Sequence, residues 1–166
     1  MAEEIVWRGT SSQLKNLRAF VLCAFIAVGI FVIHFAAHHS ESPQLRAASP
    51  FVLIALLFPI VVALGRYLRT KTKVYELTTE RLKTIDGIFS KVTDTLELYR
   101  VKDLETRQPF FARIFGLENV QLNTSDTNTP FVMIDAVPSS LGLGDKVRNN
   151  VETVRMTKRV REIDIE

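Results

Sequence analysis

The stretch AFVLCAFIAVGIFVIHFAA, residues 19–37, carries only two ionisable side chains, Cys23 and His34. A second stretch of equal length, AASPFVLIALLFPIVVALG at residues 47–65, carries none. A helix needs roughly 20 predominantly apolar residues to cross the hydrocarbon core of a bilayer. The sequence therefore predicts a hairpin of two transmembrane helices over residues 17–66.

A proline interrupts the second stretch at Pro59. Because proline has no N–H and its ring crowds the preceding turn, it kinks a helix. Transmembrane helices tolerate this when neighbouring groups satisfy the carbonyl that is left over. We therefore expect a kink at Pro59 and a helix that continues through it.

Lysine and arginine lie on one side of the predicted hairpin. Arg8, Lys15 and Arg18 precede it, and four more basic residues follow it: Arg66, Arg69, Lys71 and Lys73. The connecting loop carries only Arg46. Basic residues favour the cytoplasmic side, so the sequence predicts a multi-pass membrane protein with both termini in the cytoplasm. The four basic residues after the hairpin are also candidates for contact with anionic lipid. Their position is equally explained by the preference of basic residues for the cytoplasmic side.

After the hairpin the pattern changes to short runs that alternate between apolar and polar residues. These runs predict six or seven antiparallel strands, because a period of two is typical of half-buried strands. Asp86–Gly87 is a hairpin-turn signal, and Phe110–Phe115 reads as a helical turn or loop with two aromatic side chains facing inward. The expected strands are Val74–Thr78, Arg81–Ile85, Ile88–Val92, Thr95–Tyr99, Val101–Thr106, Asn119–Thr124 and Phe131–Ile134.

The end of the chain switches to a helical period. Pro138–Ser140 is typical of a helix start, and an apolar stripe with helical spacing follows it: Leu143, Val147, Val151 and Val154. A helix of this kind laid over a small antiparallel barrel or sandwich buries the apolar surfaces of both. The expected organisation is a cytoplasmic N-terminal lead of residues 1–16, the hairpin, a folded domain of residues 72–157 and a charged tail of residues 158–166.

Two parts of the chain resemble a known family. The runs YELTTERL (residues 75–82) and DGIF (residues 86–89) are similar to the opening hairpin of bacterial pleckstrin-homology-like (PH-like) domains of the membrane-anchored type, bacterial PH domain 2. The runs LYRVKDL (residues 98–104) and QPFFARIFGLENV (residues 108–120) resemble the most recognisable stretch of that family. Members often carry a hydrophobic hairpin before the domain and a Trp-x-Gly lead, here Trp7–Gly9. The resemblance implies a PH-like all-β fold capped by a C-terminal helix, and it implies no common activity.

Eukaryotic PH relatives bind phosphoinositides through a basic cluster on and between their first two strands. The turn that resembles theirs is Thr78–Arg81, which is short and mixed in charge. Because this turn lacks the basic cluster, we do not expect binding of a specific lipid headgroup. A general electrostatic attraction to anionic lipid is still expected.

Residues 71–166 contain no histidine and no cysteine. This composition removes Ser-His-Asp and Cys-His machinery and most transition-metal sites from the domain. Carboxylates such as Asp103 and Glu105 alternate with basic residues and read as solvated strand faces. We therefore expect neither enzymatic activity nor a resident metal or cofactor.

Three histidines lie at the outer end of the first apolar stretch. His34 and His38 are four residues apart and share a helical face, a spacing that suits a metal or haem ligand pair. Interfacial anchoring is the competing interpretation and the simpler one. A second group of candidates is expected to contact a protein partner: Phe110, Phe111, Arg155, Lys158 and Arg159.

These observations favour a membrane-anchored PH-like binding module that acts as a non-catalytic scaffold or assembly factor. Its expected partners are membrane lipid and either another protein or further copies of itself. Nucleic acid is not expected, because the basic tail lacks aromatic residues. The alternative is an accessory subunit of a larger energy-transducing or transport complex, packed through its two spans by small residues such as Ala24, Ala27 and Gly29.

Overall fold

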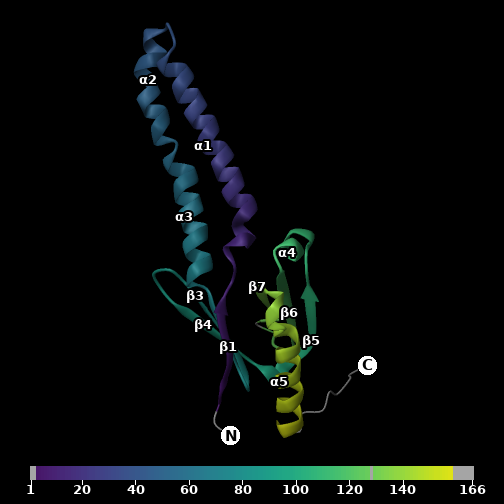
Figure 1. Ribbon diagram of the computed structural model, residues 1–166. Helices are drawn as coiled ribbons and strands as arrows, with labels where there is room; N and C mark the ends of the chain where they lie inside the picture. The colour runs from purple at the N-terminus through teal and green to yellow at the C-terminus, as the bar shows by residue number, and fades with distance from the viewer. Residues whose placement is uncertain (1–2, 128, 159–166) are drawn as a thin grey trace. The chain divides into compact units, whose positions relative to one another are not determined.

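The computed structural model describes residues 3–127 and 129–158. The chain divides into two compact units. One, the hairpin unit, comprises residues 16–68, and the other, the β unit, comprises residues 1–15 and 69–166. Figure 1 shows the helices of the first and the two sheets of the second.

The hairpin unit consists of helices joined by short turns. A short 3-10 turn, Gln13–Asn16, leads into α1, Leu17–His38, and the chain returns through α2, Pro43–Ile54, and α3, Leu57–Thr72. The two helical segments Gln13–His38 and Pro43–Thr72 are long and apolar enough to cross a membrane, as judged by length and composition alone.

The returning helix is interrupted one turn before Pro59. Helix α2 ends at Ile54 and α3 begins at Leu57. In a regular helix the N–H of residue 59 would donate to the carbonyl of Ala55, but Pro59 has no N–H. The N–H of Phe58 donates to that carbonyl instead, at 3.2 Å. The expected kink is therefore displaced to Ala55–Leu56, because the proline ring crowds the residue four positions earlier.

The first sheet of the β unit has the order β1-β2-β3-β4, and all its strand pairs are antiparallel. Its strands are β1 Ile5–Thr10, β2 Val74–Thr78, β3 Arg81–Asp86 and β4 Val92–Glu97. Strand β1 lies in the segment that sequence reasoning left as an N-terminal lead. It pairs with β2, with Thr10 opposite Val74, so the hairpin unit is an insertion between the first two strands of the sheet.

The second sheet has the order β5-β6-β7, also antiparallel. Strand β5 covers Val101–Arg107, β6 Leu117–Thr124 and β7 Phe131–Pro138. The short helix α4, Phe110–Ile114, connects β5 to β6. A 3-10 turn, Leu98–Arg100, joins the two sheets.

Helix α5, Leu143–Lys158, covers one side of the second sheet (Figure 1). Its predicted apolar stripe is confirmed, because all four members are buried. The chain reaches α5 through a 3-10 turn, Ser139–Leu141, and Gly142 in the left-handed region with φ +55°. The expected start at Pro138–Ser140 is therefore a few residues early. The core joins both sheets to the helix and includes Tyr75, Leu77, Leu82, Leu98, Val120, Leu122, Ile134, Leu143 and Val147.

Two predicted strands are shifted in the structure. The return strand expected over Ile88–Val92 is a loop, because Asp86 pairs with Val92 and Gly87, at φ +128°, opens a five-residue connection. The strand expected over Thr95–Tyr99 stops at Glu97. Leu98 then turns into the core, and its N–H donates to the carbonyl of Glu80 at 3.0 Å.

The aromatic side chains of the α4 segment do not face inward as expected. Phe110 is 73% exposed, Phe111 54% and Phe115 47%. Because α4 is only five residues long, little more than one turn, it can bury few of its side chains against a neighbouring element.

Candidate functional site

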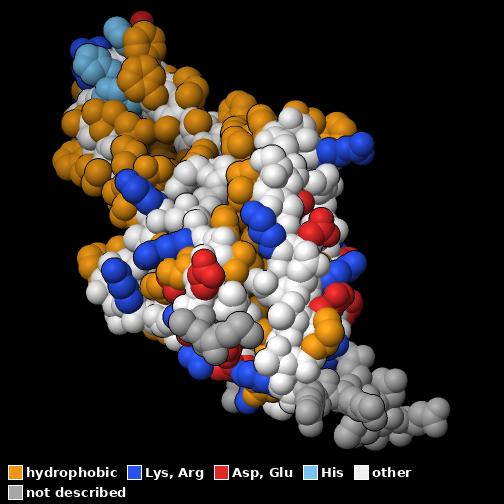
Figure 2. Space-filling model, turned by 60° about the horizontal axis from the view of Figure 1, so that its bottom comes forward, with side chains coloured by type: hydrophobic (Ala, Val, Ile, Leu, Met, Phe, Trp, Pro, Cys, Tyr) orange, Lys and Arg blue, Asp and Glu red, His pale blue; other side chains and the backbone are white. Residues whose placement is uncertain are grey.

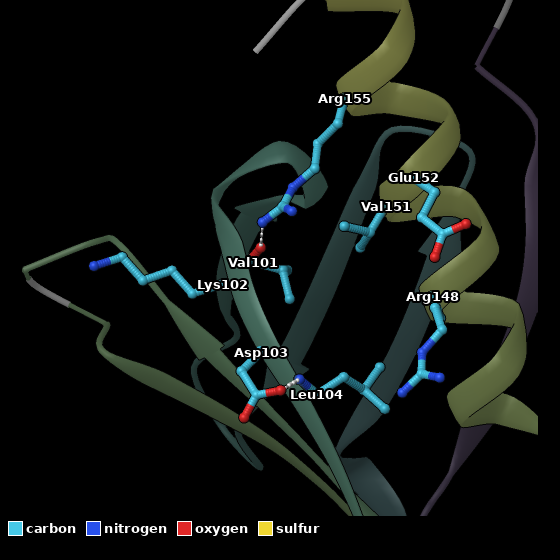
Figure 3. Close-up of a pocket in the computed structure, with 8 residues that line it drawn as sticks. All are labelled: Val101, Lys102, Asp103, Leu104, Arg148, Val151, Glu152 and Arg155. Carbon is cyan, nitrogen blue, oxygen red and sulfur yellow. Dashed lines mark hydrogen bonds between the residues drawn. The ribbon is translucent and has the colours of Figure 1, made fainter. Parts of the chain in front are cut away.

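A shallow groove runs between β5 and α5 (Figure 3). Its volume is about 170 Å³, below the 300–1,000 Å³ typical of small-molecule pockets. Two strand residues and one helix residue supply an apolar floor, namely Val101, Leu104 and Val151. The charged rim consists of Lys102, Asp103, Arg148, Glu152 and Arg155.

The groove closes toward the start of α5. A side chain in place of Gly144 would come within 2.7 Å of the Thr106 hydroxyl, so helix and strand touch at that point. Further along α5, the side chains of Arg148, Val151, Glu152 and Arg155 line the groove. Its size and mixed charge suit one or two side chains of a protein partner.

The edge of β5 that borders the groove is partly occupied. The Arg155 guanidinium donates to the carbonyl of Val101, and the Asp103 carboxylate accepts from the N–H of Leu104 at 2.8 Å (Figure 3). Side chains that engage edge groups in this way blunt a strand against pairing with another chain. Strand addition, which small barrels use to bind extended segments, is therefore disfavoured over residues 101–104.

The predicted partner-contact residues of α5 take part in intramolecular interactions. Besides Arg155, Lys158 lies 3.5 Å from the Glu80 carboxylate and 3.9 Å from that of Glu97, with its ammonium 5.0 Å from the centre of the Tyr99 ring. Both cations thus tie the end of α5 to the strands beneath. Arg159 lies outside the described residues.

The predicted lipid-contact residues lie along the last turns of α3. Arg66, Arg69 and Lys71 are exposed, and the Lys73 ammonium lies 5.3 Å from the centre of the Tyr75 ring. In this fold the connection between the first two strands is the hairpin unit and not Thr78–Arg81.

His34 and His38 remain close, with ring centres 6.0 Å apart. His34 uses Nδ1 to donate to the backbone carbonyl of Ser49 at 2.9 Å, and the Ser49 hydroxyl donates to the carbonyl of Arg46 at 2.9 Å. Pro50 cannot bond that carbonyl, so the serine takes its place. His34 thus joins α1 to α2. Within the described residues no three His, Cys, Asp or Glu side chains are grouped to hold a metal ion.

Glu118 is a buried carboxyl that sequence reasoning missed. It is 6% exposed at the start of β6, and its Oε1 has no hydrogen-bond partner within the described residues. Burial raises the pKa of Glu118, as does nearby Asp145, and the Gln108 side chain and the Leu143 backbone offset only part of the effect. It links the α4 segment to the first turn of α5. Its position in an alternating strand gave no signal of this role.

The buried carboxyl predicts a specific pH dependence. A carboxyl with a raised pKa in the folded state stabilises the fold at low pH, and this contribution is lost as pH rises through the folded-state pKa. Glu118→Gln keeps an acceptor oxygen for Leu143 and removes the charge. We expect the difference in melting temperature, variant minus wild type, to increase as the pH rises from below the ordinary glutamate pKa of about 4.5 to above the raised pKa of Glu118.

The matched control is Glu152→Gln, which removes an exposed glutamate from the same unit. Its melting temperature should follow that of the wild type across the same range. Equal pH profiles for the wild type and Glu118→Gln would contradict the role assigned to the buried carboxyl.

A seven-stranded pair of antiparallel sheets capped by a C-terminal helix defines the PH-like class of binding-module folds. A family model described as "Bacterial PH domain" matches residues 17–141, a range that includes the hairpin helices as well as strands β2 to β7. The chain belongs to the bacterial PH domain family, which confirms the resemblance found in the sequence at the level of the bacterial PH domain.

Two solved structures are similar to the chain. The Vps36 N-terminal PH domain has 17% sequence identity and a TM-score of 0.42, over 54% of this chain and 68% of that one. A DUF1696 family protein with a pleckstrin-homology domain from Shewanella loihica PV-4 has 15% identity and a TM-score of 0.40, over 50% and 74%. No curated protein matches the chain.

Proposed function

We propose that this protein is a membrane-anchored PH-like binding module that serves as a non-catalytic scaffold or assembly factor on the cytoplasmic face of the bacterial inner membrane. The exposure of α1 carries the proposal. Its 22 residues include none that is buried, and at 1.5 Å per residue the helix is about 33 Å long, enough for a hydrocarbon core of about 30 Å.

Many of the exposed side chains of α1, α2 and α3 are large and apolar. Leu22, Phe25, Phe51 and Phe58 are between 61% and 71% exposed, and Figure 2 shows hydrophobic side chains covering the hairpin helices. Soluble monomers rarely expose an apolar patch of more than a few hundred Å². Lipid is the environment in which such a surface is favourable.

Charge supports the assignment of the cytoplasmic side. Basic residues flank the hairpin where the chain enters and leaves the β unit. At the other end, beside the loop between the spans, Arg46 is the basic residue, and its guanidinium donates to the carbonyl of Ser40 at 2.9 Å. Arg66, Arg69, Lys71 and Lys73 are assigned to anionic headgroups, with about 1 kcal/mol of attraction for each basic residue near the surface. The β5–α5 groove is assigned to side chains of a protein partner.

A test of sidedness follows from the single native cysteine. In a Cys23→Ser background, Glu41→Cys is expected to react with a membrane-impermeant maleimide in intact cells, since it lies between the spans. Asn149→Cys, on α5, is expected to react only after the inner membrane is opened. Glu41 and Asn149 are both exposed, so folding does not shield either. Reaction of Asn149→Cys in intact cells would place the β unit outside and overturn the proposal.

Two glycines on the hairpin helices support a second candidate function, that of an accessory subunit in a larger membrane complex. A Cβ added at Gly29 or Gly65 would meet nothing within 4 Å, so each glycine leaves room for the close approach of a neighbouring helix. Co-purification in mild detergent separates the two functions. A large integral membrane complex supports the alternative, whereas a single stoichiometric cytoplasmic partner or further copies of the chain support the scaffold.

A further inference from the structure

Two loops of the β unit present apolar side chains to the surroundings. In the α4 segment, Phe110 is 73% and Ile114 61% exposed, and the Phe110 and Phe111 rings meet edge to face with centres 5.5 Å apart. In the loop between β3 and β4, Phe89 is 102% exposed and Ile88 39%. Neither loop contributes to the core, so folding of the β unit does not explain these residues.

The β3–β4 loop lies at the end of the β unit where the chain leaves for the hairpin. Thr10, the last residue of β1, is opposite Val74, the first residue of β2. Val74 is opposite Ile85, near the end of β3. The loop that carries Ile88 and Phe89 therefore begins beside the two points at which the chain enters and leaves the β unit.

Helix α4 lies at the same end. The N–H of Ser12, two residues beyond β1, donates to the carbonyl of Ala136 in β7 at 2.8 Å. Leu117, which starts β6 just after α4, pairs with Pro138 at the end of β7. The start of β6 and the exit of β1 are thus close together, and Figure 1 shows α4 at this end of the second sheet. By contrast, the exposed Phe131 starts β7 at the opposite end.

Basic side chains accompany both loops. Arg113 of α4 and Lys91 of the β3–β4 loop are exposed, and Arg69 and Lys71 belong to the same unit just before β2. Exposed phenylalanine and isoleucine bordered by lysine and arginine are typical of segments that bury apolar side chains among acyl chains and hold anionic headgroups. Asp135 at this end is compensated by Lys15, at 3.8 Å.

The covalent connection keeps this end near the bilayer. Val74 in β2 is nine positions beyond Gly65, the end of the apolar stretch, a reach of about 14 Å if helical. The headgroup region of one leaflet is about 5–8 Å thick. The connection is therefore short enough to bring both loops to the lipid surface.

We propose that α4 and the β3–β4 loop insert Phe110, Ile114 and Phe89 into the cytoplasmic leaflet of the bilayer that holds the hairpin. The occupant of this surface is lipid, and the β5–α5 groove is left for a protein partner. Phe110 and Phe111, expected from the sequence to contact a protein, are reassigned accordingly. The inference rests on the proposed membrane anchor.

The test uses the full chain reconstituted into vesicles of phosphatidylethanolamine and phosphatidylglycerol. Single cysteines in a Cys23→Ser background carry an environment-sensitive nitrobenzoxadiazole label, and nitroxide-labelled lipid or aqueous iodide serves as quencher. Phe110→Cys and Phe89→Cys probe the two loops, Phe131→Cys is the matched exposed phenylalanine at the opposite end, and Leu22→Cys reports on the hairpin. We expect nitroxide lipid to quench the two loop labels at least about twofold more than the label at residue 131.

The outcomes separate this inference from the membrane anchor. An unquenched label at residue 22 would refute the anchor and the inference together. A quenched label at residue 22, with loop labels that match residue 131, would overturn the inference alone. Loop labels shielded from iodide but not quenched by nitroxide lipid would show that protein, such as a second copy of the chain, covers the loops, and would also overturn it.

Discussion

Replacing residues 16–68 by a short Gly-Ser linker is expected to yield a soluble PH-like domain without the proposed membrane anchor. The two strands that flank the deletion are already paired, because Thr10 of β1 is opposite Val74 of β2 in the first sheet. The hydrophobic core and the side chains packed against it, including Trp7, come from the β unit. The shortened chain should be recovered from the supernatant without detergent and should unfold cooperatively, whereas the intact chain should resist extraction by alkaline carbonate.

A second deletion that starts the chain at Arg69 is the matched control. It also lacks the hairpin, but it loses β1 and the packing of Trp7 as well. We expect this variant to aggregate or to melt well below the linked form, because β2 would become an unprotected edge strand. Extraction of the intact chain by carbonate, or insolubility of the linked form, would contradict the division into an anchor and an autonomous β unit.

Ile134→Ala is expected to destabilise the β unit by about 2–5 kcal/mol, since it removes a fully buried side chain and leaves a cavity. Ile134 is 0% exposed in β7 and lies opposite Val120, which is equally buried in β6. A loss of this size is a large part of the stability of a small domain. Urea denaturation of the linked, hairpin-free form measures it directly.

Ile114→Ala provides the same chemical change at an exposed site. Ile114 is 61% exposed at the end of α4, so its truncation should alter the free energy of unfolding by no more than about 0.5 kcal/mol. Similar losses for both variants would show that α4 packs on the domain in solution. That result would also weaken the assignment of α4 to lipid.

The features that depended on local pattern were predictable. A run of 19 apolar residues, residues 19–37, falls within the single helix α1. The predicted stripe of α5 is buried at all four positions, and the alternation of Asn119–Thr124 is that of β6. In each case the side-chain period follows directly from helix or strand geometry, so neighbouring residues alone carried the information.

The candidate site was only partly predictable. Arg155 was named from the sequence, and Val101, Leu104 and Val151 were placed on a strand or a helical stripe. Nothing in the order of the residues indicated that this strand and this helix face each other across a groove. The burial of Glu118 was missed for the same reason, since it depends on Gln108 and Leu143 meeting it from two other segments.

The amino-acid sequence by itself determined the apolar hairpin, the alternating strands and the amphipathic helix, because each depends on the spacing of side chains within one segment. Only the tertiary structure decided that Ile5–Thr10 completes the first sheet, that the hairpin is inserted after it, and that the α4 phenylalanines face outward. The reason is that backbone pairing across more than sixty residues, as between Thr10 and Val74, is specified by the packing of the whole core and leaves no local pattern.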